Sequence, residues 1–256
     1  MIAKIGPMTL RPTIAPALAL GLLALAGASS PAQDDPPKAE ELLSKYIEAT
    51  GGAEAYKALS SRKATGTIEF AGAGLKGSLE LMQQAPDKMK TVLELEGVGT
   101  FVQGTDGTTA YEINPISGER TLEGAEKAAF LREAAFYADL DWQDYYTKAE
   151  TTGTEEVEGS TCFVVEMTPK EGAPETRYFD ADSGLLVKTK RVVQTPMGEI
   201  PVESFLGDYK EVDGITMPFS STEKLVGQEV KTTIEAVEHG VDFPEGTFAV
   251  PDSLQK

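Results

Sequence analysis

The spacing of apolar residues divides this chain of 256 residues into a short helical part and a long strand-rich part. Within residues 38–49 the apolar side chains recur at helical spacing and share one face: Leu42, Leu43, Tyr46 and Ile47. The helix is expected to end at Thr50-Gly51-Gly52, because glycine readily terminates helices. Residues 53–59 predict a second, shorter helix with Tyr56 and Leu59 on one side.

From Arg62 onward apolar and polar residues alternate, which is typical of β-strands with one buried face. The alternating segments include residues 67–70, 79–81, 89–95, 101–103, 163–167 and 232–237. Turn signals that supply the positive φ angles of tight hairpins separate them: Ala71–Gly74, Thr105–Thr108, Ser117-Gly118, Glu158-Gly159, Asp182–Gly184, Met197-Gly198, Asp213-Gly214 and Val226-Gly227. About ten strands with no dividing linker predict one antiparallel sheet or barrel.

Residues 123–146 interrupt the strands with a helical pattern. Their apolar residues form two adjacent stripes, one of Ala128, Leu131 and Ala135, the other of Phe130, Ala134 and Tyr137. A stripe this wide exceeds what a helix packed on one side of a sheet needs. Two interpretations remain open, a lid that is apolar toward a cavity and its neighbours, and a helix buried in the core.

The N-terminus has the composition of an export signal. Lys4 and Arg11 precede an uncharged Ala/Leu-rich run over residues 15–28, and small residues between Ala28 and Ala32 offer cleavage sites. The run is too short to cross a bilayer, which needs about 20 apolar residues. We therefore expect cleavage of this segment after export.

Three segments follow from this prediction: residues 1–32 are a cleaved signal peptide, residues 33–37 a flexible mature N-terminus, and residues 38–256 a single domain. The only cysteine, Cys162, lies far from the cleavage region, so no thiol there can receive a lipid. The mature protein is expected to be exported, soluble and not lipid-anchored.

Composition and charge narrow the classes of function. The chain has 23 Lys and Arg against 41 Asp and Glu, a net charge of −18, and removal of Lys4 and Arg11 with the signal makes it −20. This charge repels nucleic acid phosphates and anionic membranes, so neither nucleic acid binding nor stable membrane insertion is expected. One cysteine cannot form an intramolecular disulfide, and one cysteine with one histidine cannot build a structural zinc site.

Candidate catalytic residues are few. His239 is the only imidazole, stands beside a turn without a nucleophile motif, and is interpreted as a surface histidine. Cys162 begins an apolar strand and is interpreted as a small buried hydrophobe. Asp139, Asp141 and Asp144 could supply an acid/base pair, but a solvated helix end explains them better. The sequence predicts no enzyme, no cofactor and no metal.

Several segments resemble a known family. They are LSKYIEATGG (residues 43–52) with Ala55-Tyr56 and Thr65-Gly66-Thr67, TRYFD (176–180) with SGLLV (183–187), and DYKEVDGITMPF (208–219). Together they resemble bacterial exported proteins of the outer-membrane lipoprotein-sorting type, the LolA/LolB-like superfamily. The resemblance extends over about residues 38–251, and its motifs are structural hairpins rather than a catalytic signature.

The resemblance implies an α+β, mainly β fold, in which a curved antiparallel sheet forms a half-open barrel with helices covering its concave apolar face. Carriers of this type hold the acyl chains of lipoproteins in that cavity while crossing the periplasm, so the resemblance also implies a periplasmic location. By alternation, one face of each strand would line it: Ile68, Phe70, Leu79, Leu81, Met89, Leu93, Leu95, Phe101, Tyr111, Ile113, Phe163, Val165, Met167 and Phe205. The lid would contribute Phe130, Leu131 and Tyr137. Ordinary core packing is an equally good explanation for any one of these residues.

The predicted function is that of a soluble exported carrier or binding protein for an acyl chain, a lipid or a lipoprotein. Its partners would be that cargo and a membrane-bound donor or acceptor protein. The alternative is an envelope regulatory or sensor module that shares the fold but binds a partner protein rather than shuttling lipid, because fold alone does not fix function.

Overall fold

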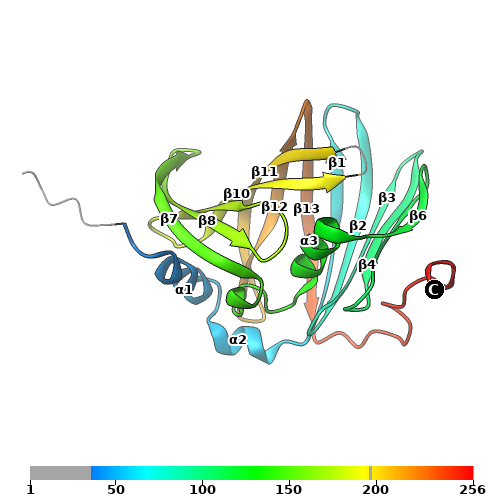
Figure 1. The fold of residues 1–256 in the computed structure, drawn as a ribbon, viewed down its shortest axis with the longest axis horizontal. Coiled ribbons are helices and arrows are strands. Elements are labelled where there is room, and N and C mark those ends of the chain that lie inside the picture. Colours follow the sequence, from blue (N-terminus) through cyan, green and yellow to red (C-terminus); the bar gives the residue numbers. More distant parts are fainter. Residues whose placement is uncertain (1–35, 196–197, 256) are drawn as a thin grey trace, which may run out of the picture. The chain divides into compact units, whose positions relative to one another are not determined.

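A computed structural model of the chain describes residues 36–195 and 198–255 (Figure 1). Within them, thirteen strands pair in one antiparallel sheet in the order β6-β5-β4-β3-β2-β1-β13-β12-β11-β10-β9-β8-β7. The strands are β1 (Ser61–Phe70), β2 (Leu75–Gln84), β3 (Lys88–Leu95), β4 (Gly99–Thr105), β5 (Ala110–Asn114), β6 (Gly118–Thr121), β7 (Tyr146–Val157), β8 (Ser160–Pro169), β9 (Glu175–Asp180), β10 (Leu186–Thr195), β11 (Gly198–Val212), β12 (Ile215–Leu225) and β13 (Gln228–His239).

The helices are few and short. They are α1 (Ala39–Ala49), α2 (Ala53–Ala58), α3 (Gly124–Ala134) and the 3₁₀ turns η1 (Trp142–Asp144) and η2 (Asp252–Leu254). No helix of the described ranges is long and apolar enough to span a bilayer. The predicted export signal, residues 1–32, lies outside the described residues, as do residues 33–35 of the predicted flexible segment.

The sheet consists of two meanders that meet at β1. One runs from β1 through β2 to β6, and the other runs from β7 through β8 to β13, whose Val230 pairs with Phe70 of β1. β6 and β7 are the two edge strands and do not pair with each other, so the curved sheet does not close into a barrel. The segment that joins these edge strands contains α3, which lies across the hollow of the curved sheet (Figure 1).

Tight turns set the register of the hairpins. The two-residue turn between β7 and β8 has φ of 51° at Glu158 and 91° at Gly159, and the turn between β11 and β12 has 51° at Asp213 and 80° at Gly214. Positive φ at both turn residues is the requirement of a type I′ hairpin, whose twist matches that of the strands it joins. These sequence-predicted turns therefore fix which residues pair along β7–β8 and β11–β12.

Helices α1 and α3 both pack on the same, concave face of the sheet. The apolar stripe of α1 contacts Val165, Met167 and other buried residues of β8 to β10, whereas α3 packs on β3 and β5. The faces match because Met167 of the α1 core pairs with Glu175 across β8 and β9, and Glu175 lies 3.9 Å from Arg132 of α3. The predicted curved sheet with helices over its concave face is confirmed.

A second, smaller core lies on the opposite face of β7 to β10. It contains Val157, Cys162, Val164 and Tyr178, with Cys162 completely buried. The interpretation of Cys162 as a small buried hydrophobe is therefore confirmed.

The predicted helix over residues 123–146 is wrong in length, because α3 ends at Ala134. The chain after it forms turns and η1, and two hydrogen bonds tie it to connecting segments beside the sheet: the Phe136 amide donates to the Pro86 carbonyl at 2.9 Å and the Tyr137 hydroxyl to the Leu59 carbonyl at 2.7 Å. Tyr146 already begins β7. Strands are also more numerous than predicted, since polar-rich segments such as β6 and β7 lack the alternation that would reveal them.

Candidate ligand-binding face

An apolar strip runs across β1 to β4 on the concave face. Leu79 of β2 pairs with Leu93 of β3, which pairs with Phe101 of β4, so the three side chains lie in one row. Because side chains on one face recur every second residue, Ile68 and Phe70 of β1 belong to the same face. All five side chains are only half-buried.

α3 covers the adjoining part of this face. Phe130 and Ala134 of α3 are buried against Met89 and Ala110, and Leu81 packs at the edge of the cluster. The apolar strip therefore divides into a part beneath α3 and a part beside it. Side chains in the second part retain apolar surface that the described residues do not cover.

The predicted lid residues have different positions. Phe130 is 8% exposed in the α3 cluster, and Leu131 packs at its margin. Tyr137 lies beyond the end of α3 and anchors the following segment through the Leu59 carbonyl. All three are thus brought to the region where the α3 segment meets the sheet.

The predicted cavity residues of β8 lie under α1. Val165 and Met167 are fully buried in the α1 cluster, and Phe163 packs at its edge. Leu95, at the far end of β3, is also buried. These residues share the concave face with the strip, but the contacts of the β8 residues are those of a helix-on-sheet core. A ligand-binding role for any of them stays a prediction.

Three predicted cavity residues point away from the concave face. Ala110 packs against α3, so its neighbour Tyr111 points to the other side of β5, where it is 1% exposed, and Ile113 follows it. Phe205 packs with the outer cluster around Tyr178. Alternation misassigns them because a shift of one residue reverses every side chain of a strand.

The concave face of β9 is charged at Glu175 and Arg177, whereas Phe179 on the same face belongs to the α1 core. The Arg177 guanidinium lies 2.9 Å from the carboxylates of both Asp139 and Glu175, and the Tyr146 hydroxyl donates to Glu175 at 2.7 Å. Burial acts to raise the pKa of Glu175, but Arg177 and the hydrogen bond from Tyr146 outweigh it and hold the pKa below its usual value. Burial raises the pKa of Tyr146 to about 12. Each charge in this cluster therefore has a partner.

Ion pairs also connect α3 to the sheet at both of its ends. Near its start, Glu126 receives two hydrogen bonds from Arg120 of β6, at 2.5 and 2.7 Å. Near its end, Glu133 lies 3.7 Å from Arg191 of β10, which also bonds Glu223 of β12 at 3.0 Å. The helix is thus held between the two halves of the sheet.

Arg62 of β1 is a further cation on this face, and its side chain is half-buried. Its Nε donates to the Gln83 amide oxygen at 3.1 Å, and its Nη2 donates to the same oxygen. Its Cζ lies 5.8 Å from the centre of the Phe136 ring, in the segment after α3. The sequence analysis missed all the arginines of this face. A signal for Arg62 existed, because it stands two residues before the inward-facing Ala64, at an inward position.

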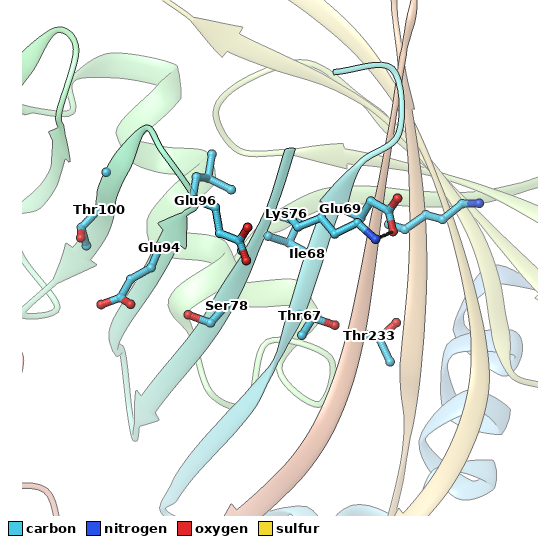
Figure 2. Close-up of a pocket in the computed structure, with 13 residues that line it drawn as sticks. Thr67, Ile68, Glu69, Lys76, Ser78, Glu94, Glu96, Thr100 and Thr233 are labelled. Carbon is cyan, nitrogen blue, oxygen red and sulfur yellow. Dashed lines mark ion pairs between the residues drawn. The ribbon is translucent and has the colours of Figure 1, made fainter. Parts of the chain in front are cut away.

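The opposite face of the sheet has a polar groove of about 910 Å³. Figure 2 shows Thr67, Ser78 and Thr233 lying on adjacent strands, as their pairing in one cross-strand row requires. Most of the lining side chains carry hydroxyl or charged groups: Thr67, Glu69, Lys76, Ser78, Glu94, Glu96, Thr100, Lys231 and Thr233. Ile68, Gly77, Leu95 and Gly99 also border the groove, although they occupy concave-face positions in the register. Its hydroxyl and charged groups make it unsuitable for an acyl chain.

The titratable residues considered from the sequence form no catalytic constellation. The His239 side chain is only 3% exposed and its Nδ1 lies 3.1 Å from an Asp213 oxygen, so the interpretation as a surface histidine is wrong. Asp139 binds Arg177, whereas Asp141 and Asp144 are exposed. Across residues 36–195 and 198–255 no three His, Cys, Asp or Glu side chains are grouped to hold a metal ion.

One open, curved antiparallel sheet with helices on its concave face defines the class of half-open barrels, and solved structures place the chain within it. It has a LolA/LolB-like fold. A LolA superfamily protein from Nitrosomonas europaea superposes with a TM-score of 0.59 at 12% identity, covering 86% of this chain and 100% of that one.

Two further structures agree. A DUF1329 family protein from Desulfovibrio piger gives a TM-score of 0.57 at 15% identity, covering 85% of this chain and 99% of that one. A putative outer membrane lipoprotein-sorting protein domain from Vibrio parahaemolyticus gives 0.52 at 15% identity, with 81% and 97% covered. No protein-family model matches the chain, and no curated protein matches its sequence. These likenesses establish the fold.

Proposed function

We propose that this protein is an exported binding protein or carrier that holds an acyl chain on the concave face of its sheet. The observation that supports this most directly is the apolar strip beside α3, where Leu79, Leu93 and Phe101 share a row and stay half-buried. An acyl chain laid there would remove apolar surface from water on both partners.

Burial of acyl methylenes supplies sufficient affinity for this role. Each methylene transferred from water contributes about 0.8 kcal/mol, so several of them outweigh the cost of association without any special polar contact. Binding is proposed rather than catalysis, because the carboxylates Glu175 and Asp139 on this face are both ion-paired with Arg177.

Export to the periplasm, as a soluble protein without a lipid anchor, is part of the same proposal. It is supported by the signal-like composition of residues 1–32 and by the lack of a cysteine near their end. A membrane-bound donor and acceptor would then load and unload the cargo. In the alternative function, the same fold would bind a partner protein in a complex that forms without lipid.

The proposal is tested by the lipids that the protein retains. We expect mass spectrometry of extracts from the natively purified protein to detect acyl lipids or lipoprotein, and the delipidated protein to take up a fluorescent fatty acid. The absence of both would rule the carrier function out. A stoichiometric protein complex that forms equally well with delipidated protein would support the regulatory alternative.

A pair of variants in β3 tests which face binds. Leu93 lies on the concave face, and its neighbour Val92 lies on the other face and is also half-buried. We expect Leu93→Asn to weaken fatty acid uptake about tenfold or more, because it places an amide in the acyl site, and Val92→Asn to leave uptake unchanged. Equal effects of the two substitutions at equal stability would contradict the assignment of the site.

A further inference from the structure

The contacts of Arg62 differ from those of the other arginines in the described residues. Arg120, Arg132, Arg177 and Arg191 each lie within 4.0 Å of at least one carboxylate, at distances from 2.5 to 3.9 Å. Arg62 has no such ion pair within residues 36–195 and 198–255 and instead bonds the neutral amide of Gln83. Its Nη1 donates no hydrogen bond to any residue of these ranges.

The Arg62 side chain is nevertheless half-buried. The Phe136 ring lies over it, and burial lowers its pKa below the usual arginine value. The Asp139 carboxylate attracts this charge from beyond ion-pair distance. A partly buried positive charge with no carboxylate in direct contact is still costly, because the hydration it loses on burial is not fully replaced. Arginine remains protonated even so, and its planar fork matches the two oxygens of a carboxylate.

Arg62 also lies at one end of the apolar strip. Along β1 the concave face presents Arg62, Ala64, Gly66, Ile68 and Phe70 in succession, over eight residue steps or about 26 Å. Gln83, the partner of Arg62, donates its amide to the Met89 sulfur at 3.6 Å, and Met89 lies beneath α3. Arg62 therefore lies on the same face as the apolar surface that we assign to the acyl chain, with the buried Ala64 and Gly66 between them.

We infer that the cargo of this face is a long-chain carboxylate, whose head group binds the Arg62 guanidinium while its acyl chain lies along β1 and β2. The inference rests on the proposed function and specifies its ligand. One guanidinium with one positive charge matches a monoanion. The acyl chains of a lipoprotein, which are held in ester or amide linkage, would not provide this charge.

The test compares two probes that differ only in head-group charge. The delipidated protein is titrated at pH 8 with a fluorescent long-chain fatty acid and with the methyl ester of the same probe. We expect the acid to bind about tenfold or more tightly than the ester, as one charge-assisted hydrogen bond would provide. In Arg62→Met, which keeps the length of the side chain and removes its charge, this ratio should fall to about one while the ester affinity is retained.

Arg120→Met is the matched control, because it removes an arginine from the β6 end of α3 and should leave the acid-to-ester ratio unchanged. A purely structural Arg62 would change both affinities together and leave their ratio intact. If Arg62→Met fails to fold, the wild-type ratio and Arg62→Lys, which keeps the charge and should keep part of the preference, serve the same purpose.

The outcomes separate the two proposals. Equal binding of acid and ester by the wild-type protein, or an undiminished preference in folded Arg62→Met, would overturn the carboxylate inference and leave the acyl-binding function standing. Failure of the wild-type protein to bind either probe would overturn the proposed function and the inference together.

Discussion

Ion pairs on the concave face are energetically acceptable because they come as a network. Arg177 is 12% exposed and Glu175 is 16% exposed, so each would be costly alone. Their mutual contact, together with the Tyr146 hydroxyl and Asp139, replaces the hydrogen bonds to water that these groups lose on burial. At the scale of single residues, stability here depends on completeness of the network rather than on any one contact.

Removing Arg177 should therefore be strongly destabilising. We expect Arg177→Met to lower the free energy of unfolding at pH 7 by about 3 kcal/mol or more, because Glu175 is left buried without its main counter-charge. In the wild type the pKa of Glu175 is lowered, so its contribution is present above the ordinary carboxyl pKa and is lost as the pH falls through the folded value. Denaturant unfolding at several pH values measures this.

The pH dependence separates this mechanism from simple loss of packing. In the variant, burial raises the pKa of Glu175, so protonation relieves the unpaired charge and the deficit relative to wild type should shrink toward pH 4. Arg120→Met is the control, since its pairs are more exposed and are expected to contribute about 1 kcal/mol or less. A deficit that is constant across the pH range would refute the account.

Among the elements, the link between α1 and α2 is held by close approach to the β11–β12 turn. The Thr216 amide donates to the Thr50 carbonyl at 3.0 Å. At Gly51, where φ is +126°, an added Cβ would lie 2.2 Å from the Gly214 carbonyl oxygen. Glycine is needed at that position because any side chain would push the helices away from the sheet.

Gly51→Ala and Gly52→Ala make a matched pair for this contact. Gly52 also has a positive φ, +83°, but a Cβ there would meet nothing within 4 Å. We expect Gly52→Ala to cost about 1 kcal/mol for the left-handed backbone and Gly51→Ala to cost at least about 2 kcal/mol more. Thermal and denaturant unfolding of both variants would measure the difference, and equal losses would show that the close approach is unimportant.

α3 illustrates how an element between two edge strands is positioned. It follows β6 and precedes β7, and its ion pairs to Arg120 and Arg191 reach opposite halves of the sheet. Its apolar contacts, in contrast, are confined to the β3–β5 side. This arrangement leaves the strip around Leu79 and Leu93 beside the helix rather than beneath it, which is the basis of the proposed acyl site.

At the scale of the whole molecule, the net charge of −20 expected after signal cleavage bears on how a carrier would leave a membrane. Charges of the same sign on the protein and on an anionic bilayer repel one another over about 8 Å at physiological salt. A carrier with this surface would deliver its cargo without adhering to the lipid.

We therefore expect the mature protein not to sediment with vesicles of anionic phospholipid at physiological salt, and lower salt should not promote binding, because it lengthens the range of repulsion. Zwitterionic vesicles are the control for apolar attraction. Tight association with anionic vesicles that weakens as salt is added would contradict the proposed shuttle cycle.

Much of the fold was predictable because its signals are local. The apolar spacing of residues 38–49 predicts α1 within one residue, and Glu158-Gly159 and Asp213-Gly214 predict their hairpins. Residues 135–145 were not predictable, since their helical pattern is overridden by hydrogen bonds to Pro86 and Leu59, about 50 and 78 positions away. Local propensity is a weak signal where such tertiary contacts compete.

The sequence by itself determined the strand-rich class, the positions of most turns, the exposed acidic character and the amphipathic α1. Only the tertiary structure decided which side of each strand faces the helices, because facing depends on pairing between distant residues such as Phe70 and Val230. In the folded chain Tyr111 and Phe205 lie on the outer face and Arg62 lies on the inner, concave face. A charged residue in a strand is ambiguous until the neighbouring strands and helices define its environment, which is the physical reason why the candidate head-group site emerged only from the folded chain.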